Sequence, residues 1–89
     1  MTEQATIYLC DDDEDVRGGL SFLLRHSGFD VRAFASGKEL LECIEVEPKP
    51  LRAIFVLDLD MPPMDGDVVH DQLIEMGYSK RNPVVFLSG

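Results

Sequence analysis

The segment 53–57, AIFVL, constrains the fold most strongly, because all five of its residues are apolar. A strand exposed on one face alternates apolar and polar residues, whereas a wholly apolar strand is typical of a sheet that is covered on both faces. Pro48 and Pro50 break the chain just before this segment. We therefore expect a buried strand here, in a sheet with helices on both sides.

Strand-like and helix-like segments alternate along the rest of the chain. Strand patterns occur at 5–10, 29–34, 53–57 and 84–87, and apolar residues recur with helical spacing at 14–26, after Ser36 and at 66–76. Gly28 suits a left-handed helix cap, and Ser36 with Glu39 forms a capping box. This alternation predicts an α/β fold with a parallel sheet. Because crossovers are right-handed, we expect the flavodoxin-like, doubly wound strand order 2-1-3-4, without its last strand.

Composition narrows the classes of function. The 89 residues suffice for one domain, 1–89, and include 8 basic and 17 acidic residues, for a net charge of −9. This charge argues against direct binding to nucleic acid or to an anionic membrane, since both need a basic face. No apolar run approaches the roughly 18 residues of a membrane span, and the N-terminus does not resemble a signal peptide. Cys10 and Cys43 are too few for a disulfide framework and indicate reduced thiols in a cytoplasmic protein.

Acidic residues follow two of the predicted strands. Residues 11–13 (DDD) end the first strand and residues 58–60 (DLD) end the third, so the topology brings both groups to the crevice where the strand order reverses. A divalent cation would relieve the repulsion between them, and oxygen ligands without His or Cys favour Mg²⁺. A carboxylate in such a site can attack phosphorus to give an aspartyl phosphate. A hydroxyl such as that of Ser88, after the fourth strand, could bond a phosphoryl oxygen.

Each acidic stretch also has a plainer explanation. Asp13, Glu14 and Asp15 suit the start of a helix, where the macrodipole favours acidic side chains. The stretch DLDMPPMDG at 58–66 suits a turn-rich loop. The interpretation as a site depends on the two stretches occurring together, each at the end of a buried strand.

Three stretches resemble the receiver domain of two-component response regulators. They are CDDDEDVR at 10–17, VLDLDMPPMDG at 56–66 and VVFLSG at 84–89. The stretch VRAFASG at 31–37 is most similar to the FixJ-like branch of that family. The resemblance extends from Thr6 to Gly89 and implies a CheY-like fold.

The resemblance implies a role for each candidate residue. Asp58 corresponds to the phospho-acceptor, and Ser88 corresponds to the hydroxyl that switches toward the phosphoryl group. Mg²⁺ would be held by Asp11 and Asp12, together with Asp58 and the backbone carbonyl of Asp60. A domain of this kind acts as a signalling switch rather than as a turnover enzyme.

The resemblance also implies partners. The phosphoryl group would come from a sensor histidine kinase or a phosphotransfer protein, which would dock on the first helix around Arg17, Gly18 and Ser21. Members of this branch often carry a DNA-binding output domain, and some form dimers. The family pattern continues with a helix, a fifth strand that bears a lysine, and a final helix, so we expect the sequence ending at Gly89 to be an incomplete receiver domain. The strand at 84–87 would then be an apolar edge prone to association.

Two other functions remain open. One is a pseudo-receiver, which binds a partner without being phosphorylated. The other is a phosphatase of the haloacid dehalogenase superfamily, in which Asp58 attacks and Asp60 serves as acid and base. Met61 and Pro62 do not match the residues expected after that superfamily's nucleophile motif, and the acidic residues at 11–15 would have no role in it.

Overall fold

The computed structural model describes residues 5–47, 52–78 and 82–88. Pro48, Pro50 and Gly89 lie outside these residues, so the predicted chain break is not described. The elements are β1 (Thr6–Cys10), α1 (Glu14–His26), β2 (Asp30–Phe34), α2 (Gly37–Val46), β3 (Ala53–Asp58), α3 (Gly66–Glu75) and β4 (Val84–Leu87). The alternation predicted from the sequence is confirmed, and no predicted bound differs by more than one residue. None of the described helices is long and apolar enough to cross a membrane.

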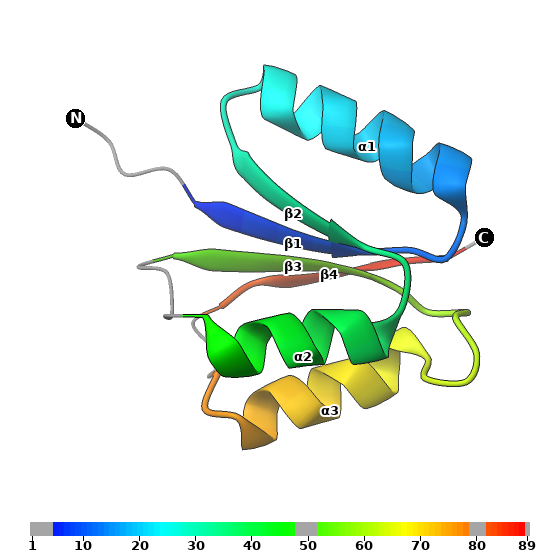
Figure 1. The fold of residues 1–89 in the computed structure, drawn as a ribbon, viewed down its shortest axis with the longest axis vertical. Helices are drawn as coiled ribbons and strands as arrows, with labels where there is room; N and C mark the ends of the chain where they lie inside the picture. Colours follow the sequence, from blue (N-terminus) through cyan, green and yellow to red (C-terminus); the bar gives the residue numbers. More distant parts are fainter. Residues whose placement is uncertain (1–4, 48–51, 79–81, 89) are drawn as a thin grey trace.

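The four strands form one parallel sheet in the order β2-β1-β3-β4, as predicted. In Figure 1, α1 lies on one side of the sheet, and α2 and α3 lie on the other. The carboxyl ends of all four strands therefore meet at one edge of the molecule. At this edge, the ends of β1 and β3 lie side by side, although the two strands are far apart along the chain.

The larger core lies between the sheet and the pair α2 and α3. Phe55 of β3 is 1% exposed and stacks on Tyr8 with ring centroids 5.3 Å apart. A smaller core of Ile7, Leu9 and Val31 lies beneath α1. Because α1 packs on β1 and β2, it leaves the other face of β3 only partly covered, and Ile54 and Val56 are half-buried. The expectation that β3 is buried on both faces is thus met fully on one face and partly on the other.

Local signals set the helix ends. Gly28, which follows α1, has a φ of 97°, as its predicted role in a left-handed cap requires. The Ser36 hydroxyl accepts a hydrogen bond from the Glu39 N–H at 3.2 Å, and the Glu39 carboxylate reaches back to the Ala35 N–H at 3.2 Å. Both side chains of the predicted capping box therefore cap the start of α2, although Glu39 accepts from the residue before the N-cap Ser36 rather than from the N-cap itself. Both cysteines are free: Cys10 is buried and Cys43 is partly exposed.

Candidate functional site

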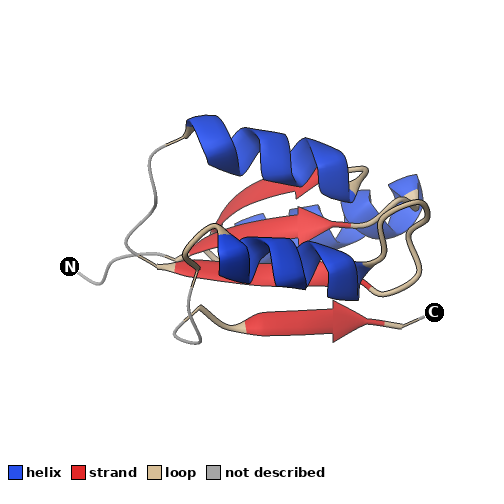
Figure 2. Cartoon of the chain, turned by 90° about the horizontal axis from the view of Figure 1, so that it is seen from below, coloured by secondary structure: helices blue, strands red, loops and turns tan. Residues whose placement is uncertain are grey.

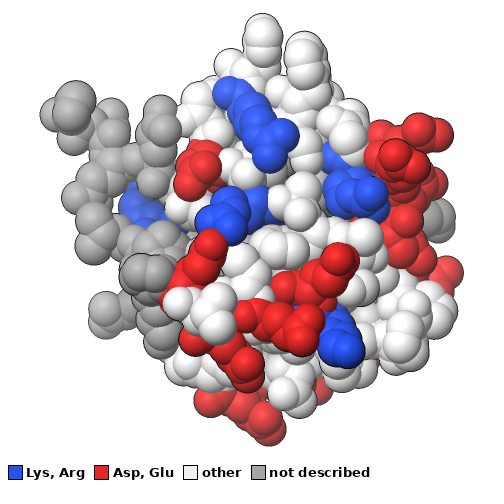
Figure 3. Space-filling view, viewed as in Figure 1, with Lys and Arg blue, Asp and Glu red and all other residues white. Residues whose placement is uncertain are grey.

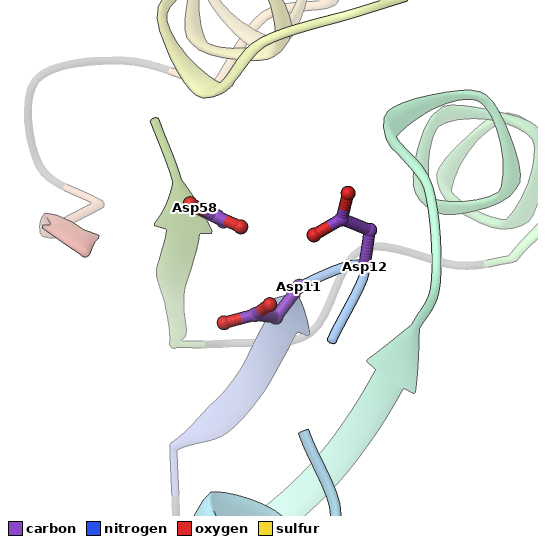
Figure 4. A group of neighbouring side chains, drawn as sticks. All are labelled: Asp11, Asp12 and Asp58. Carbon is purple, nitrogen blue, oxygen red and sulfur yellow. The ribbon is translucent and has the colours of Figure 1, made fainter. Parts of the chain in front are cut away.

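Three carboxylates converge where β1 and β3 end. Cys10 and Leu57 are partners in the parallel register, so the residues that follow them emerge side by side. Oxygen atoms of Asp11, Asp12 and Asp58 all lie within 4.8 Å of one another (Figure 4). The two acidic stretches therefore meet as the topology predicts.

Asp58 is held in a nearly buried position. Asp58 is 9% exposed, and its Oδ1 accepts a hydrogen bond from the Asp60 N–H at 3.0 Å. Burial raises the pKa of the Asp58 carboxyl above its ordinary value, and the nearby charge of Asp11 adds to the increase. The site thus concentrates negative charge that a bound cation would stabilise.

Asp11 is fixed mainly by backbone contacts. It is 4% exposed, and its Oδ1 accepts a hydrogen bond from the Asp13 N–H at 2.9 Å. The Arg17 guanidinium donates to the Asp11 carbonyl oxygen at 2.8 Å rather than to a carboxylate. Within the described ranges, no Lys or Arg forms an ion pair with the three clustered carboxylates.

Asp13 belongs to the helix and not to the cluster. Its Oδ1 accepts hydrogen bonds from the Asp15 N–H at 2.9 Å and the Val16 N–H at 3.2 Å, which makes it the N-cap of α1. Glu14 and Asp15 lie in the first turn of that helix. The plainer explanation therefore holds for residues 13–15, whereas Asp11 and Asp12 face Asp58.

The loop between β3 and α3 is built around Asp58. A Cβ on Gly66 would lie 2.5 Å from the Asp58 carbonyl oxygen, so only glycine allows α3 to begin this close to the strand. The Asp65 carboxylate accepts a hydrogen bond from the Met61 N–H at 2.7 Å and so closes the loop. Met61 is 2% exposed and packs against the Cys10 thiol, whose pKa burial raises to about 12.

The sequence reasoning missed the role of Asp65. An acidic residue just before a helix usually indicates an N-cap, and Asp65 occupies that position, but its side chain caps nothing. Its contact with Met61 depends on how the loop returns toward the sheet, so no pattern in the sequence could have identified it.

One cavity of about 390 Å³ is lined by all the predicted site residues. Its lining includes the polar residues Asp11, Asp12, Asp58, Asp60 and Ser88 and the apolar residues Val16, Leu20 and Leu87. Leu87 is the register partner of Asp58, so Ser88 follows it at the same edge. The Asp60 carboxylate is not part of the three-carboxylate group. Acidic side chains gather on the side of the molecule toward which the strands point (Figures 1 and 3).

The histidines lie away from the acidic cluster. His26 stacks on Phe22 with ring centroids 5.1 Å apart, and His70 meets Phe86 edge to face at 5.7 Å. Both histidines pack against aromatic rings.

The donor set fits a magnesium ion. Three carboxylates supply hard oxygen ligands, which Mg²⁺ prefers, and the histidines and thiols do not join the group. Two of the three carboxylates are nearly buried without a basic partner among the described side chains. Such an arrangement suits chemistry in which a carboxylate, a cation and a phosphoryl group come together.

Known proteins with similar sequences include several response regulators. The response regulator receiver domain family matches residues 7–89. The tetrathionate response regulatory protein TtrR of Salmonella typhimurium is 38% identical over 85 residues, which cover 96% of this chain and 39% of TtrR. The response regulator protein TodT of Pseudomonas putida is 36% identical over 90 residues, which cover 100% of this chain and 37% of TodT.

Solved structures of response regulators also superimpose on this chain. The response regulator StyR superimposes with a TM-score of 0.81 at 33% identity, covering 98% of this chain and 41% of StyR. FixJ-N superimposes with a TM-score of 0.82 at 28% identity, covering 100% of this chain and 66% of FixJ-N. The chain therefore spans well under half the length of TtrR, TodT and StyR.

Proposed function

Since this chain belongs to the family of response regulator receiver domains, we propose that it accepts a phosphoryl group on Asp58 and acts as a switch in two-component signalling. The observation that carries this proposal is the group of Asp11, Asp12 and Asp58, of which Asp11 and Asp58 are nearly buried and none has a basic partner among the described residues. A solvated acidic surface would not bury two of its carboxylates.

Asp58 is the nucleophile. The Asp60 N–H bonds its Oδ1, which orients the carboxylate and leaves Oδ2 for the attack. A bond forms between Oδ2 and phosphorus as the bond between phosphorus and the histidine nitrogen of the donor breaks. The electron pair of the broken bond returns to the imidazole of the donor.

The neighbouring groups balance the charge of this reaction. Asp11, Asp12, Asp58 and the backbone carbonyl of Asp60 would hold Mg²⁺, which when bound neutralises negative charge on the carboxylates and the phosphoryl oxygens. The Asp13 N–H and the Arg17 guanidinium keep Asp11 in position. The hydroxyl of Ser88 donates to a phosphoryl oxygen and so reports phosphorylation to β4.

A sensor histidine kinase or phosphotransfer protein docks on α1. A groove of about 480 Å³ runs along this helix and includes Arg17, Gly18, Ser21, Phe22 and Arg25. The guanidinium of Arg25 donates to the Val31 carbonyl oxygen at 3.0 Å, as that of Arg17 does to Asp11, so both remain available to acidic groups of a partner. The two glycines at 18 and 19 leave open space beside the helix.

The whole protein extends this function. Relatives include proteins named as transcriptional regulators, such as TdiR of Thauera aromatica, and the chain covers 35% of TdiR. We therefore propose a DNA-binding output domain in the complete protein and a cytoplasmic location, where kinase and output meet. That residues 1–89 form one receiver domain, continued by further elements, stays a prediction.

The test is a phosphorylation assay on the folded chain. Incubation with Mg²⁺ and acetyl phosphate should add one phosphoryl group to the intact mass, and Asp58→Asn should abolish the addition. Asp60→Asn is the matched control: it keeps the backbone carbonyl, so a receiver retains the adduct, whereas a haloacid dehalogenase phosphatase loses its acid and base. Folding of each variant is checked by circular dichroism.

Each outcome selects one function. An adduct on the parent chain and on Asp60→Asn, but not on Asp58→Asn, supports the receiver. A folded chain that never forms an adduct favours the pseudo-receiver. Repeated hydrolysis of a phosphate ester that requires Asp60 favours the phosphatase.

A further inference from the structure

The loop between β3 and α3 carries the backbone carbonyl of Asp60, which the proposed magnesium site uses as a ligand. Figure 2 shows the loops gathered beyond the arrowheads of the strands, and in Figure 1 the yellow-green loop after β3 is one of them. Asp60 is exposed, and it lines the same cavity as Asp11 and Asp58. A group that ligates a metal is usually oriented by further hydrogen bonds, so the neighbours of this carbonyl bear on how well it can serve.

The N–H of Asp60 is held by Asp58. Oδ1 of Asp58 accepts it at 3.0 Å, which fixes the peptide group on the β3 side of Asp60. The Asp60 carbonyl belongs to the following peptide group, which Asp60 shares with Met61. The bond to Asp58 therefore does not by itself determine where the carbonyl points.

Asp65 holds the following peptide group. Its Oδ1 accepts a hydrogen bond from the Met61 N–H at 2.7 Å, a length typical of a bond to a carboxylate. Because this peptide group is planar and trans, the Met61 N–H and the Asp60 carbonyl point in opposite directions within one plane. A bond that fixes the N–H therefore also fixes the direction of the carbonyl.

The Met61 side of the peptide group is anchored in the core. Met61 is 2% exposed and belongs to the larger core cluster, where its sulfur lies 3.4 Å from the Cys10 thiol. With both flanking residues held, the remaining movement is rotation of the peptide group about the line between their Cα atoms. That rotation turns the carbonyl, and the bond to Asp65 opposes it.

Asp65 takes this role in place of the one that its position suggests. It is the N-cap residue of α3 but makes no side-chain cap bond, whereas Asp13 at the same position of α1 bonds two N–H groups of its helix. Gly66 allows α3 to begin against the backbone of Asp58 and so brings Asp65 beside the loop. The carboxylate is therefore directed at the loop and not at the helix.

We propose that Asp65 is a positioning residue, which aims the Asp60 carbonyl at the Mg²⁺ site formed with Asp11, Asp12 and Asp58. This inference rests on the proposed function and adds to it a residue that is not among the described residues lining the cavity. Asp65 acts through its acceptor oxygen and the peptide group, and not through its charge. Without this bond, the peptide group turns and Mg²⁺ binds more weakly, although every ligand is still present.

The test measures Mg²⁺ binding to the whole chain without a phosphate donor. Amide chemical shifts are followed by NMR during titration with MgCl₂ at constant ionic strength. Asp65→Ala should raise the dissociation constant by about tenfold, as loss of an orienting contact typically does. It should also shift the Met61 amide proton upfield, because the hydrogen bond is lost. Asp65→Asn keeps an acceptor oxygen in place, so both values should stay close to those of the parent chain.

Two further variants separate positioning from charge and from folding. Asp67→Ala removes a nearby acid whose carboxylate bonds only the adjacent Val68 N–H among the described contacts, and it should leave Mg²⁺ binding unchanged. If Asp65→Ala fails to fold, Asp65→Ser gives the same comparison. Serine is favoured at an N-cap, and its hydroxyl is shorter than the carboxylate that reaches Met61.

Phosphorylation by acetyl phosphate provides a second measurement. The Asp65→Ala chain should need about ten times more Mg²⁺ for half of its maximal rate. At saturating Mg²⁺ its rate should approach that of the parent chain, because Asp58 is unaltered. A maximal rate that falls while the Mg²⁺ requirement stays the same would overturn the role in aiming the carbonyl.

The remaining outcomes distinguish this inference from the function on which it rests. Unchanged Mg²⁺ affinity in a folded variant that has lost the Met61 amide shift overturns the inference alone. Equal weakening in Asp65→Asn and Asp65→Ala assigns the effect to charge and also overturns it. A parent chain that binds no Mg²⁺ and accepts no phosphoryl group overturns the proposed function and this inference together.

Discussion

At the scale of single residues, neighbouring acids in one run serve different purposes. Asp13 caps α1, whereas Asp11 and Asp12 face Asp58 across the end of the sheet. The difference comes from position: Asp11 still continues the direction of β1, whereas Asp13 is the extended N-cap residue just before α1 begins at Glu14. A run of like charges is therefore better interpreted residue by residue than as one acidic surface.

Glu47 provides a test of electrostatics away from the site. The Arg32 guanidinium donates to both oxygens of Glu47, at 2.8 and 2.6 Å, and this contact holds the pKa of the Glu47 carboxyl below its usual 4.5. A lowered pKa contributes stability at higher pH and loses it as the pH falls through the folded value. We expect the urea midpoint of the parent chain to fall between pH 5 and about pH 3 more steeply than that of Glu47→Gln.

The control for this prediction is Glu45, in the last turn of α2, the helix that Glu47 caps. Glu45→Gln alters an exposed side chain with no ion pair among the described residues, and its midpoint should follow the parent chain. Because both partners are partly exposed, the difference should be small. Equal slopes for the parent chain and Glu47→Gln would contradict the assignment.

At the scale of elements, the helices differ in how much room their glycines have. A Cβ on Gly19 of α1 would meet nothing within 4 Å, whereas one on Gly37 would lie 2.5 Å from a methyl carbon of Val69. Gly37 therefore allows α2 to approach α3, and Gly19 has no such packing role. The same substitution should have opposite effects in the two helices.

Gly19→Ala should stabilise the chain by about 1 kcal/mol, because alanine loses less backbone entropy in a helix. Gly37→Ala should destabilise it by about 1–3 kcal/mol, because the added methyl group overpacks the contact with Val69. Urea unfolding measures both changes. A destabilising Gly19→Ala would mean that α1 has a neighbour at this position.

At the scale of the whole molecule, the site and the global stability are coupled. The three carboxylates repel one another in the folded chain, and a cation that binds only the folded state shifts the unfolding equilibrium by mass action. The acidic cluster thus lowers stability in the absence of a cation, and the function proposed here uses that charge.

Mg²⁺ should therefore raise the free energy of unfolding, by about 1.4 kcal/mol at ten times its dissociation constant. NaCl at matched ionic strength should have a smaller effect. Asp12→Asn should reduce the Mg²⁺ effect, whereas Asp15→Asn, in the first turn of α1, should retain it. An identical response of both variants to Mg²⁺ would show that the ion acts on the general charge and not at this site.

The sequence by itself determined the order of the elements, the bounds of all of them but the end of α2 to within a residue, the strand order and the meeting of two acidic stretches. These features depend on local periodicity and on caps such as Ser36 with Glu39, which the amino-acid sequence shows directly. They also depend on general rules of chain crossover, which need only the order of the elements. Only the tertiary structure decided which acids form the cluster, that Asp65 closes the loop, that Gly66 lies against Asp58 and that Val85 and Phe86 are exposed. These depend on contacts between residues distant in the chain, where a shift of a few ångströms changes a partner without changing any pattern.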